Sequence, residues 1–196
     1  MIKTSNIIKS QLEKYSNKNN KISRDIKNGK LVKIVNGLYE TDANTPGYLL
    51  ASSIYGPSYL SFDFALYYYG LIPEKVLAYT SATFDKKKKK KYETPFGTYL
   101  YRDVPKKVYS VGIKLVEDGK YSYQIATPEK ALCDKLYTLS PVKNIVEIEN
   151  LLFNDLRIDE EEFNQLNIQE IEEINKMYHS TNVKLLYKYA KKKIKK

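Results

Sequence analysis

The sequence has one cysteine, one histidine and no long apolar run, and each scarcity excludes a class of protein. Cys133 alone cannot form an intramolecular disulfide or a metal site built on several cysteines. His179 alone excludes sites that need several histidines. No apolar run reaches the roughly 18–20 residues of a transmembrane helix, and the first six residues lack the apolar stretch of a signal peptide. We therefore expect a soluble, cytoplasmic protein that does not bind membranes.

The chain of 196 residues carries a formal net charge of +10, and 42% of its residues are hydrophobic. That apolar content is enough for a folded core, so the charge does not belong to a disordered basic tail. A basic protein favours polyanionic partners such as nucleic acid. Only three of the 33 basic residues are arginine. Codon usage in an AT-rich genome is therefore an alternative source of part of the lysine excess.

The positive charge is concentrated in particular segments. Residues 1–46 hold nine basic and four acidic residues. The excess in residues 47–140 comes from a lysine run at 86–91, which is either a solvated hairpin tip or a loop that contacts phosphates. Residues 141–196 are neutral overall, because an acidic stretch precedes a lysine-rich end.

The N-terminal segment has the pattern of two helices followed by a hairpin. Helical spacing and a capping Ser5 predict a first helix over residues 5–15, with four apolar positions: Ile7, Ile8, Leu12 and Tyr15. A second helix over 19–28 places Ile22 and Ile26 inward and ends at Gly29. Two β-prone runs flank Asn36-Gly37, a pair typical of type I′ hairpin turns. This order predicts a winged helix-turn-helix DNA-binding domain over residues 1–45.

The outward face of the second helix carries side chains suited to DNA. Five residues form this face: Asn20, Lys21, Ser23, Arg24 and Lys27. The hairpin adds Lys30, Lys33 and Asn36. Arginine and asparagine read base edges, whereas lysine mostly contacts phosphates. The alternative is a small helical pair with solvated lysines, and periodicity alone does not separate the two.

Residues 46–196 predict a second, mixed α/β domain with antiparallel strands. Helices are expected at 48–55 and 62–69, the latter capped by Ser61, and strands at 76–83, 92–102, 108–116 and 121–126. Thr127-Pro128 marks a further helix start. On that helix Lys130 and Asp134 predict an exposed ion pair, and Cys133 a buried apolar residue. Helices follow from about residue 140, so the whole chain is expected to be α+β.

No enzyme motif is present. A nucleotidyltransferase needs a Gly-Ser turn before paired aspartates, and the sequence has neither that turn, nor a P-loop, nor a Ser/His/Asp set. We expect a protein that is not an enzyme and holds no cofactor or metal. The enzyme alternative is a metal-dependent nuclease, whose candidate acids match no known spacing: Asp103, Glu117, Asp118 and Glu129.

Four stretches, at residues 29–39, 58–73, 94–102 and 125–136, occur in an order found in one family. Through them the sequence resembles the AbiEi antitoxins of abortive-infection AbiE systems. The stretches contain ten motif positions without an assigned role: Ser61, Ala65, Leu66, Gly70, Pro95, Gly97, Pro128, Glu129, Lys130 and Asp134.

The resemblance implies an antitoxin that is also a transcriptional autorepressor. Its winged helix would bind inverted repeats in its own promoter, and so double-stranded DNA. The rest of the chain would counteract a nucleotidyltransferase-like toxin without forming a stable complex. An alternative from the residues themselves is a protein–protein interaction module that does not bind DNA specifically.

Overall fold

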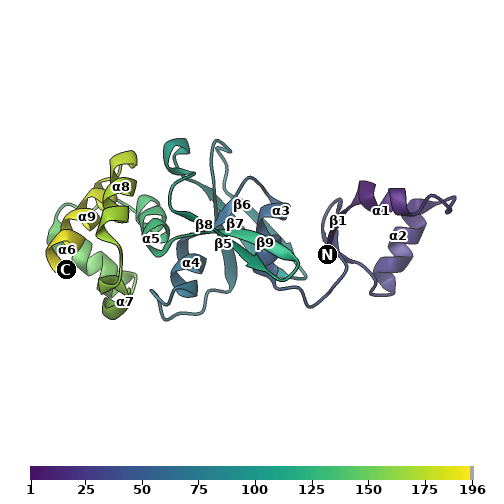
Figure 1. Ribbon diagram of the computed structural model, residues 1–196, viewed down its shortest axis with the longest axis horizontal. Helices are drawn as coiled ribbons and strands as arrows, with labels where there is room; N and C mark the ends of the chain where they lie inside the picture. The colour runs from purple at the N-terminus through teal and green to yellow at the C-terminus, as the bar shows by residue number, and fades with distance from the viewer. Residues whose placement is uncertain (195–196) are drawn as a thin grey trace.

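The computed structural model describes residues 1–194. Helices account for 43% of the residues and strands for 22%, which confirms a mixed α+β protein. The molecule is elongated: a small N-terminal lobe lies at one end, a six-stranded sheet lies in the middle and a group of helices lies at the other end (Figure 1). Within residues 1–194, no helix is long and apolar enough to cross a membrane.

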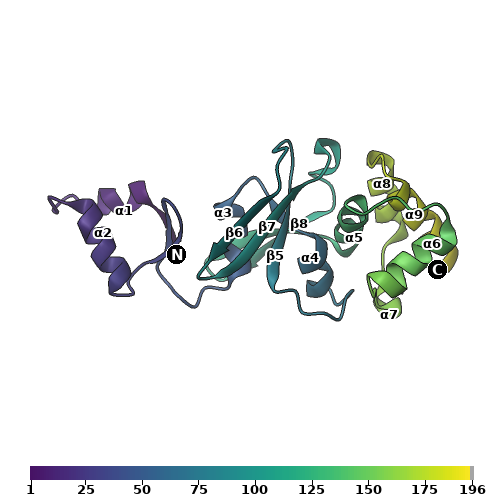
Figure 2. The ribbon, with the colours of Figure 1, turned by 180° about the vertical axis from the view of Figure 1, so that it is seen from behind.

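The N-terminal lobe, residues 1–40, combines two helices with three short strands. Its elements in chain order are β1 (Ile2–Thr4), α1 (Ser5–Gln11), α2 (Lys18–Lys27), β2 (Val32–Val35) and β3 (Leu38–Glu40). The strands pair antiparallel in the order β1-β3-β2. Ile8, Ile22 and Leu31 are buried together, so the lobe has a small apolar cluster of its own. Figure 2 shows the lobe and its two helices from behind.

The first predicted helix is too long at its C-terminal end. It ends at Gln11, because Leu12 leaves the helical conformation (φ −108°, ψ 29°), and residues 12–17 form a turn. Thr4 replaces Ser5 as the cap, and its hydroxyl accepts a hydrogen bond from the N–H of Ile7 at 3.4 Å. The residues before it form β1, which was not predicted. As a result Ile8 is buried, whereas Ile7 and Tyr15 are exposed.

The second helix and its end agree with the prediction, but the hairpin turn does not. Gly29 follows α2 with a φ of +68°, the left-handed conformation expected of a glycine after a helix. In the hairpin only Gly37 has a positive φ (+82°), so the turn is not type I′, which needs two such residues. The register shifts between Lys33 and Val35, and this bulge accommodates the different turn.

The central sheet has six strands in the order β6-β7-β5-β4-β9-β8. Their bounds are β4 (Tyr59–Leu60), β5 (Ala78–Thr83), β6 (Lys90–Thr94), β7 (Gly97–Asp103), β8 (Ile113–Asp118) and β9 (Tyr121–Ala126). The prediction of antiparallel strands is wrong for two pairs, since β5–β7 and β4–β9 are parallel. The parallel pair β5–β7 arises because β6 forms the outer strand of a hairpin with β7, which then returns beside β5. The strand predicted at 108–116 begins later, after a short 3₁₀ helix, η2 (Lys106–Val108), and Gly112, whose φ is +65°.

Helices cover both faces of this sheet. On the side of the N-terminal lobe lie η1 (Gly47–Leu50) and α3 (Ala51–Ile54), and on the other side lie α4 (Phe62–Tyr68) and α5 (Pro128–Tyr137) (Figures 1 and 2). The hydroxyls of Tyr99 and Tyr101 donate to the carbonyls of Gly47 and Ala51 at 2.9 and 2.7 Å. These bonds tie β7 to η1 and α3.

The remaining chain is helical, in agreement with the prediction for residues beyond about 140. Its elements are α6 (Ile145–Asn150), η3 (Leu151–Asp155, π-helical), α7 (Glu160–Asn164), α8 (Ile168–Met177) and α9 (Thr181–Lys193). The amide of buried Asn182 donates to the carbonyls of Leu136 and Ser140 at 3.1 and 3.0 Å, which fixes α9 against the end of α5. Of the lysine-rich end, Lys195 and Lys196 lie outside the described residues.

Candidate nucleic-acid interface

The recognition side chains predicted on α2 lie on one exposed helix face. Asn17 caps the helix, since its side-chain oxygen accepts a hydrogen bond from the N–H of Asn20 at 3.0 Å. Ile22 is buried in the cluster of the lobe and Ile26 packs against it. Because these two residues face inward, the opposite face is solvent-accessible, and it exposes Asn20, Ser23, Arg24 and Lys27.

Lys21 differs from the other predicted α2 residues. Its side chain is partly buried, and its Nζ pairs with Asp25 Oδ1 at 2.5 Å. The same nitrogen lies 5.5 Å from the centre of the Tyr15 ring. The hydrogen bond to Asp25 raises the pKa of Lys21, which keeps the lysine charged and paired. We therefore expect a smaller contribution to phosphate binding from Lys21 than from its neighbours.

The three predicted hairpin residues are also exposed. Lys30 precedes β2, Lys33 lies within it and Asn36 stands in the turn. The backbone N–H of Lys30 donates to the carbonyl of Asp25 at 2.9 Å, which fixes the start of the hairpin against the end of α2. The structure thus presents the predicted hairpin and helix residues from one small folded unit.

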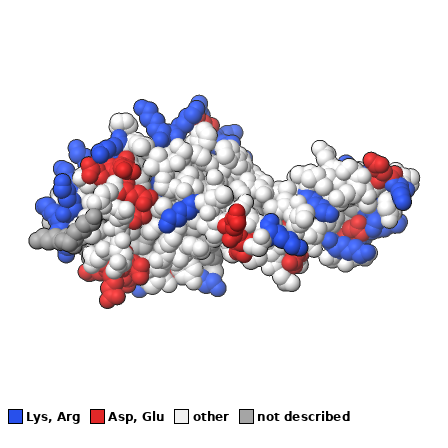
Figure 3. All heavy atoms as spheres, viewed as in Figure 1, with Lys and Arg blue, Asp and Glu red and all other residues white. Residues whose placement is uncertain are grey.

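The electrostatics of this unit are strongly positive. Residues 18–33 contain six basic residues and one acidic residue, Asp25. Asp25 forms an ion pair with Lys21. Arg24 forms no ion pair within residues 1–194. Figure 3 shows lysine and arginine side chains over the N-terminal lobe, with acidic side chains between them. Such a surface attracts polyanions and gains affinity from each phosphate it neutralises.

Three of the motif residues meet far from this surface, in a buried polar network around Asp134. Asp134 Oδ2 accepts hydrogen bonds from the hydroxyl of Ser61 at 2.6 Å and of Tyr59 at 2.9 Å. Its Oδ1 accepts from Lys130 Nζ and from the Tyr178 hydroxyl. Burial and the neighbouring carboxylate raise the pKa of both tyrosines, so they remain hydroxyl donors. The Asp134 network therefore joins β4, the start of α4, α5 and the end of α8.

This network corrects two predictions. Lys130 and Asp134 were expected to form an exposed ion pair, but both side chains are completely buried, because α5 is enclosed by α4 on one side and α8 and α9 on the other. Ser61 stands at the N-cap position of α4 but does not cap it, since its hydroxyl donates to Asp134 instead. Tyr59 and Tyr178 were not predicted as partners, because no local pattern links them to α5.

The other motif residues have packing or turn positions. Ala65 and Leu66 are buried in α4, and Gly70 follows that helix with a φ of +75°. Pro95 and Gly97 stand at the β6–β7 turn, where a side chain at residue 97 would collide with the Tyr79 ring. Pro128 is the first residue of α5, and Glu129 beside it is buried. These motif residues therefore have structural roles, in packing, in turns and at a helix start.

The acidic residues considered for a nuclease have unrelated partners. The Tyr48 hydroxyl donates to Asp118 at 2.7 Å, and the N–H of Asn167 donates to Glu129 at 2.7 Å. Burial raises the pKa of Glu129. In the described part of the chain, no three or more His, Cys, Asp or Glu side chains form a group that could hold a metal ion. The acids named for that alternative are therefore not brought together as a metal-binding group.

Comparison with known proteins finds no match, neither to a protein-family model nor to a curated protein. The functional interpretation therefore rests on the residues described above and on the resemblance of the four motif stretches.

Proposed function

We propose that the protein is a DNA-binding transcriptional repressor and the antitoxin of a toxin–antitoxin operon, with the N-terminal lobe acting as a winged helix-turn-helix domain. One observation carries the DNA-binding part: two helices stand before a β2–β3 hairpin, and α2 presents an exposed cationic face beside that hairpin. In addition, β1 pairs with β3, so the hairpin belongs to a three-stranded sheet. These features support the proposal of a winged helix, here with two helices before the wing where a full winged helix has three.

In this proposal α2 enters the major groove of double-stranded DNA. Arg24 and Asn20 are the side chains able to read base edges, because their donor groups match purine acceptors. Lys27, Lys30 and Lys33 bind phosphates and supply affinity without sequence preference. The hairpin, with Asn36 at its tip, lies against the backbone or the minor groove. The target is a pair of inverted repeats in the protein's own promoter, as the family resemblance implies.

The antitoxin part of the proposal rests on the family resemblance alone. In it, residues beyond the N-terminal lobe counteract a nucleotidyltransferase-like toxin without a stable complex. The test is co-expression with the toxin from the neighbouring gene. Growth should be rescued, and the two proteins should separate on purification. Stable co-purification would favour the interaction-module alternative, and failure to rescue growth would contradict the antitoxin assignment.

The DNA-binding part is tested by fluorescence anisotropy with duplexes from upstream of the operon and with scrambled duplexes. The wild-type protein should prefer the upstream DNA. Arg24→Met should lose roughly 1–3 kcal/mol of that preference if Arg24 contacts a base. Lys27→Met should instead weaken binding to both duplexes alike and lower the salt slope by about 1. Equal affinity of the wild-type protein for both duplexes would overturn the repressor assignment.

A further inference from the structure

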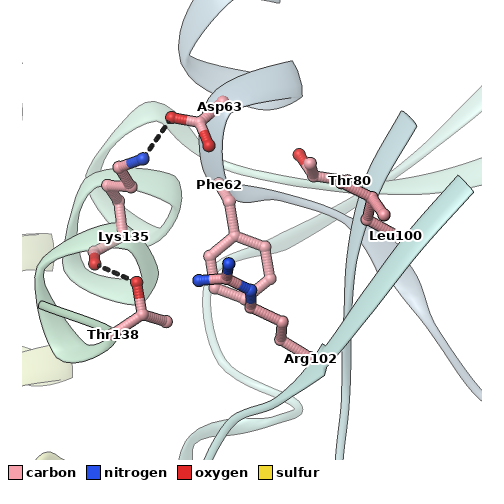
Figure 4. A pocket seen from close by; sticks show the side chains of 7 residues that line it. All are labelled: Phe62, Asp63, Thr80, Leu100, Arg102, Lys135 and Thr138. Carbon is pink, nitrogen blue, oxygen red and sulfur yellow. Dashed lines mark hydrogen bonds and ion pairs between the residues drawn. The ribbon is translucent and has the colours of Figure 1, made fainter. Parts of the chain in front are cut away.

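Two adjoining hollows lie beside the central sheet, on the side of α4 and α5. The inner one is a cavity of about 50 Å³ between α4, α5 and β7, and it is lined by Phe62, Lys135 and Arg102 among others (Figure 4). The outer one, of about 280 Å³, is lined by Lys87, Lys88 and Lys89 and again by Arg102. Because Arg102 and Thr138 line both, the two form one continuous Arg102 hollow.

The Arg102 hollow holds an excess of positive charge. Five cationic side chains line it, against the carboxylates of Asp63 and Asp103. Asp63 is engaged by Lys135 Nζ at 2.5 Å. Asp103 is engaged by the Thr83 hydroxyl at 2.6 Å and by the backbone N–H of Lys87 at 2.7 Å. The acidic groups are thus satisfied by their own neighbours.

Unlike these two carboxylates, the Arg102 guanidinium is not paired with a neighbouring side chain within residues 1–194. Within residues 1–194 its guanidinium forms no hydrogen bond or ion pair, and Figure 4 shows it beside the Phe62 ring. A guanidinium offers a rigid fork of N–H donors that fits the oxygens of phosphate. Arg102 is an exposed residue, so an anion can reach its guanidinium from solvent.

The backbone around the hollow is held in unusual conformations. Four non-glycine residues of the described chain have positive φ, and three of them line or flank the hollow: Phe62 (54°), Asp85 (54°) and Lys87 (55°). Such conformations cost free energy and are concentrated where a ligand must be clamped. The Lys86 ammonium donates to the carbonyl of Gly56 at 3.1 Å, so the lysine loop is fixed in place at its start.

We propose that the Arg102 hollow is a phosphate-binding site, distinct from the DNA-binding face of α2. Arg102 binds the phosphate oxygens at the mouth of the inner cavity, between α4, α5 and β7. Lys87 to Lys89 supply further positive charge from the outer hollow, where a sugar or a continuing chain would lie. The phosphate belongs either to a mononucleotide or to the backbone of nucleic acid.

The site is tested on the full chain by isothermal titration with three probes: pyrophosphate, ATP without metal ions and a random-sequence DNA duplex. Saturable binding of pyrophosphate is expected, and Arg102→Met should weaken it about tenfold or more. Arg102→Lys should recover only part of the loss, because lysine lacks the fork. Lys120→Met, an exposed lysine on the β8–β9 turn, is the matched control and should leave pyrophosphate binding unchanged.

The probes also identify the source of the phosphate. Tighter binding of ATP than of pyrophosphate, without competition from the duplex, indicates a mononucleotide. Competition by the duplex, reduced in Arg102→Met, indicates a nucleic-acid backbone. The proposal is overturned if no probe binds saturably, or if Lys120→Met weakens binding as much as Arg102→Met does. Arg102→Met should retain the preference for upstream DNA, so failure of this site is distinguishable from failure of the repressor function.

Discussion

Asp134 is the centre of a buried polar network in the interior of the protein. Its two oxygens accept four hydrogen bonds, from side chains that lie up to 75 positions away in the sequence. Lys130 is completely buried. Within the described chain, Asp134 is the only carboxylate that pairs with it. A buried ammonium without a counter-charge is far more costly than an intact pair.

Asp134→Ala should therefore lower the free energy of unfolding by about 3–5 kcal/mol, because it leaves the Lys130 charge buried and unpaired. Urea denaturation followed by circular dichroism measures this loss. The matched control is Glu172→Ala, which breaks an exposed pair of the same spacing, to Lys176 at 3.1 Å. That control should cost less than about 1 kcal/mol. Equal losses in the two variants would show that the burial of the Lys130 pair contributes nothing.

Sequence reasoning correctly placed Lys130 and Asp134 on one side of a helix and wrongly placed that side in solvent. Spacing of four residues fixes which side chains are neighbours, but it does not say what covers them. The covering elements, α4 and the end of α8, come from distant parts of the chain. For Cys133 the local context was sufficient, since its apolar neighbour Leu132 favoured burial and the side chain is indeed inaccessible.

Cys133 should be unreactive toward thiol reagents in the native protein. Burial raises the pKa of its thiol, so almost no thiolate forms, and the reagent has no access to the sulfur. Labelling should be at least about a thousandfold slower than for a cysteine introduced at exposed Ser52, since it must await unfolding. Mass spectrometry over time provides the rates. Labelling of Cys133 as fast as that of Ser52→Cys would refute its burial.

At the scale of elements, features set by neighbouring residues were predicted well, whereas features set by distant residues were not. The starts of α2 and α5 and the end of α2 were predicted well, because caps such as Thr127 and a glycine such as Gly29 act within a few residues. The strands β1 and β4 were missed and the parallel pairs were not foreseen. Strand pairing depends on partners far along the chain, and strands of two or three residues carry no periodicity.

The cap of α2 should matter for DNA binding, because this helix carries the proposed recognition residues. Asn17→Ala removes the acceptor for the N–H of Asn20 and should destabilise the start of α2 by about 0.5–2 kcal/mol. Hydrogen exchange of the α2 amides should speed up correspondingly, and affinity for upstream DNA should fall. Asn17→Ser, which keeps a capping oxygen, should stay close to the wild-type protein in both measurements. A loss in Asn17→Ser equal to that in Asn17→Ala would exclude capping as the cause.

At the scale of the whole molecule, the positive charge of the described residues lies on separate surfaces, among them the lysine-rich end of α9 and two that the proposals use. One is the exposed face of α2 in the N-terminal lobe, and the other is the Arg102 hollow beside the central sheet, with the intervening sheet between them (Figure 1). The sequence identified both basic segments, but it could not show that the lysine run lies next to Arg102. That proximity arises because β6 and β7 form a hairpin beside β5.

Glu40, at the end of β3, is one link between the N-terminal lobe and the central sheet, and it should make stability depend on acid pH. Glu40 is fully buried, and its carboxylate accepts hydrogen bonds from the Tyr121 hydroxyl at 2.9 Å, from the Met1 amine and from the N–H of Thr41 at 2.8 Å. Burial by itself would raise the pKa of Glu40, but these donors outweigh it and hold the pKa below its ordinary value of 4.5.

A carboxylate with a lowered pKa stabilises the folded state fully above its ordinary pKa, and this contribution is lost as pH falls through the lower, folded-state value. Glu40→Gln should therefore unfold more easily than the wild-type protein at neutral pH, and the difference should shrink as pH falls below 4.5. Urea denaturation at a series of pH values measures this difference. Glu117→Gln, at an exposed position on β8, is the control for the substitution and should change the free energy of unfolding little. A Glu40→Gln difference that stays constant down to pH 3 would mean that the carboxylate charge does not hold the lobe to the central sheet.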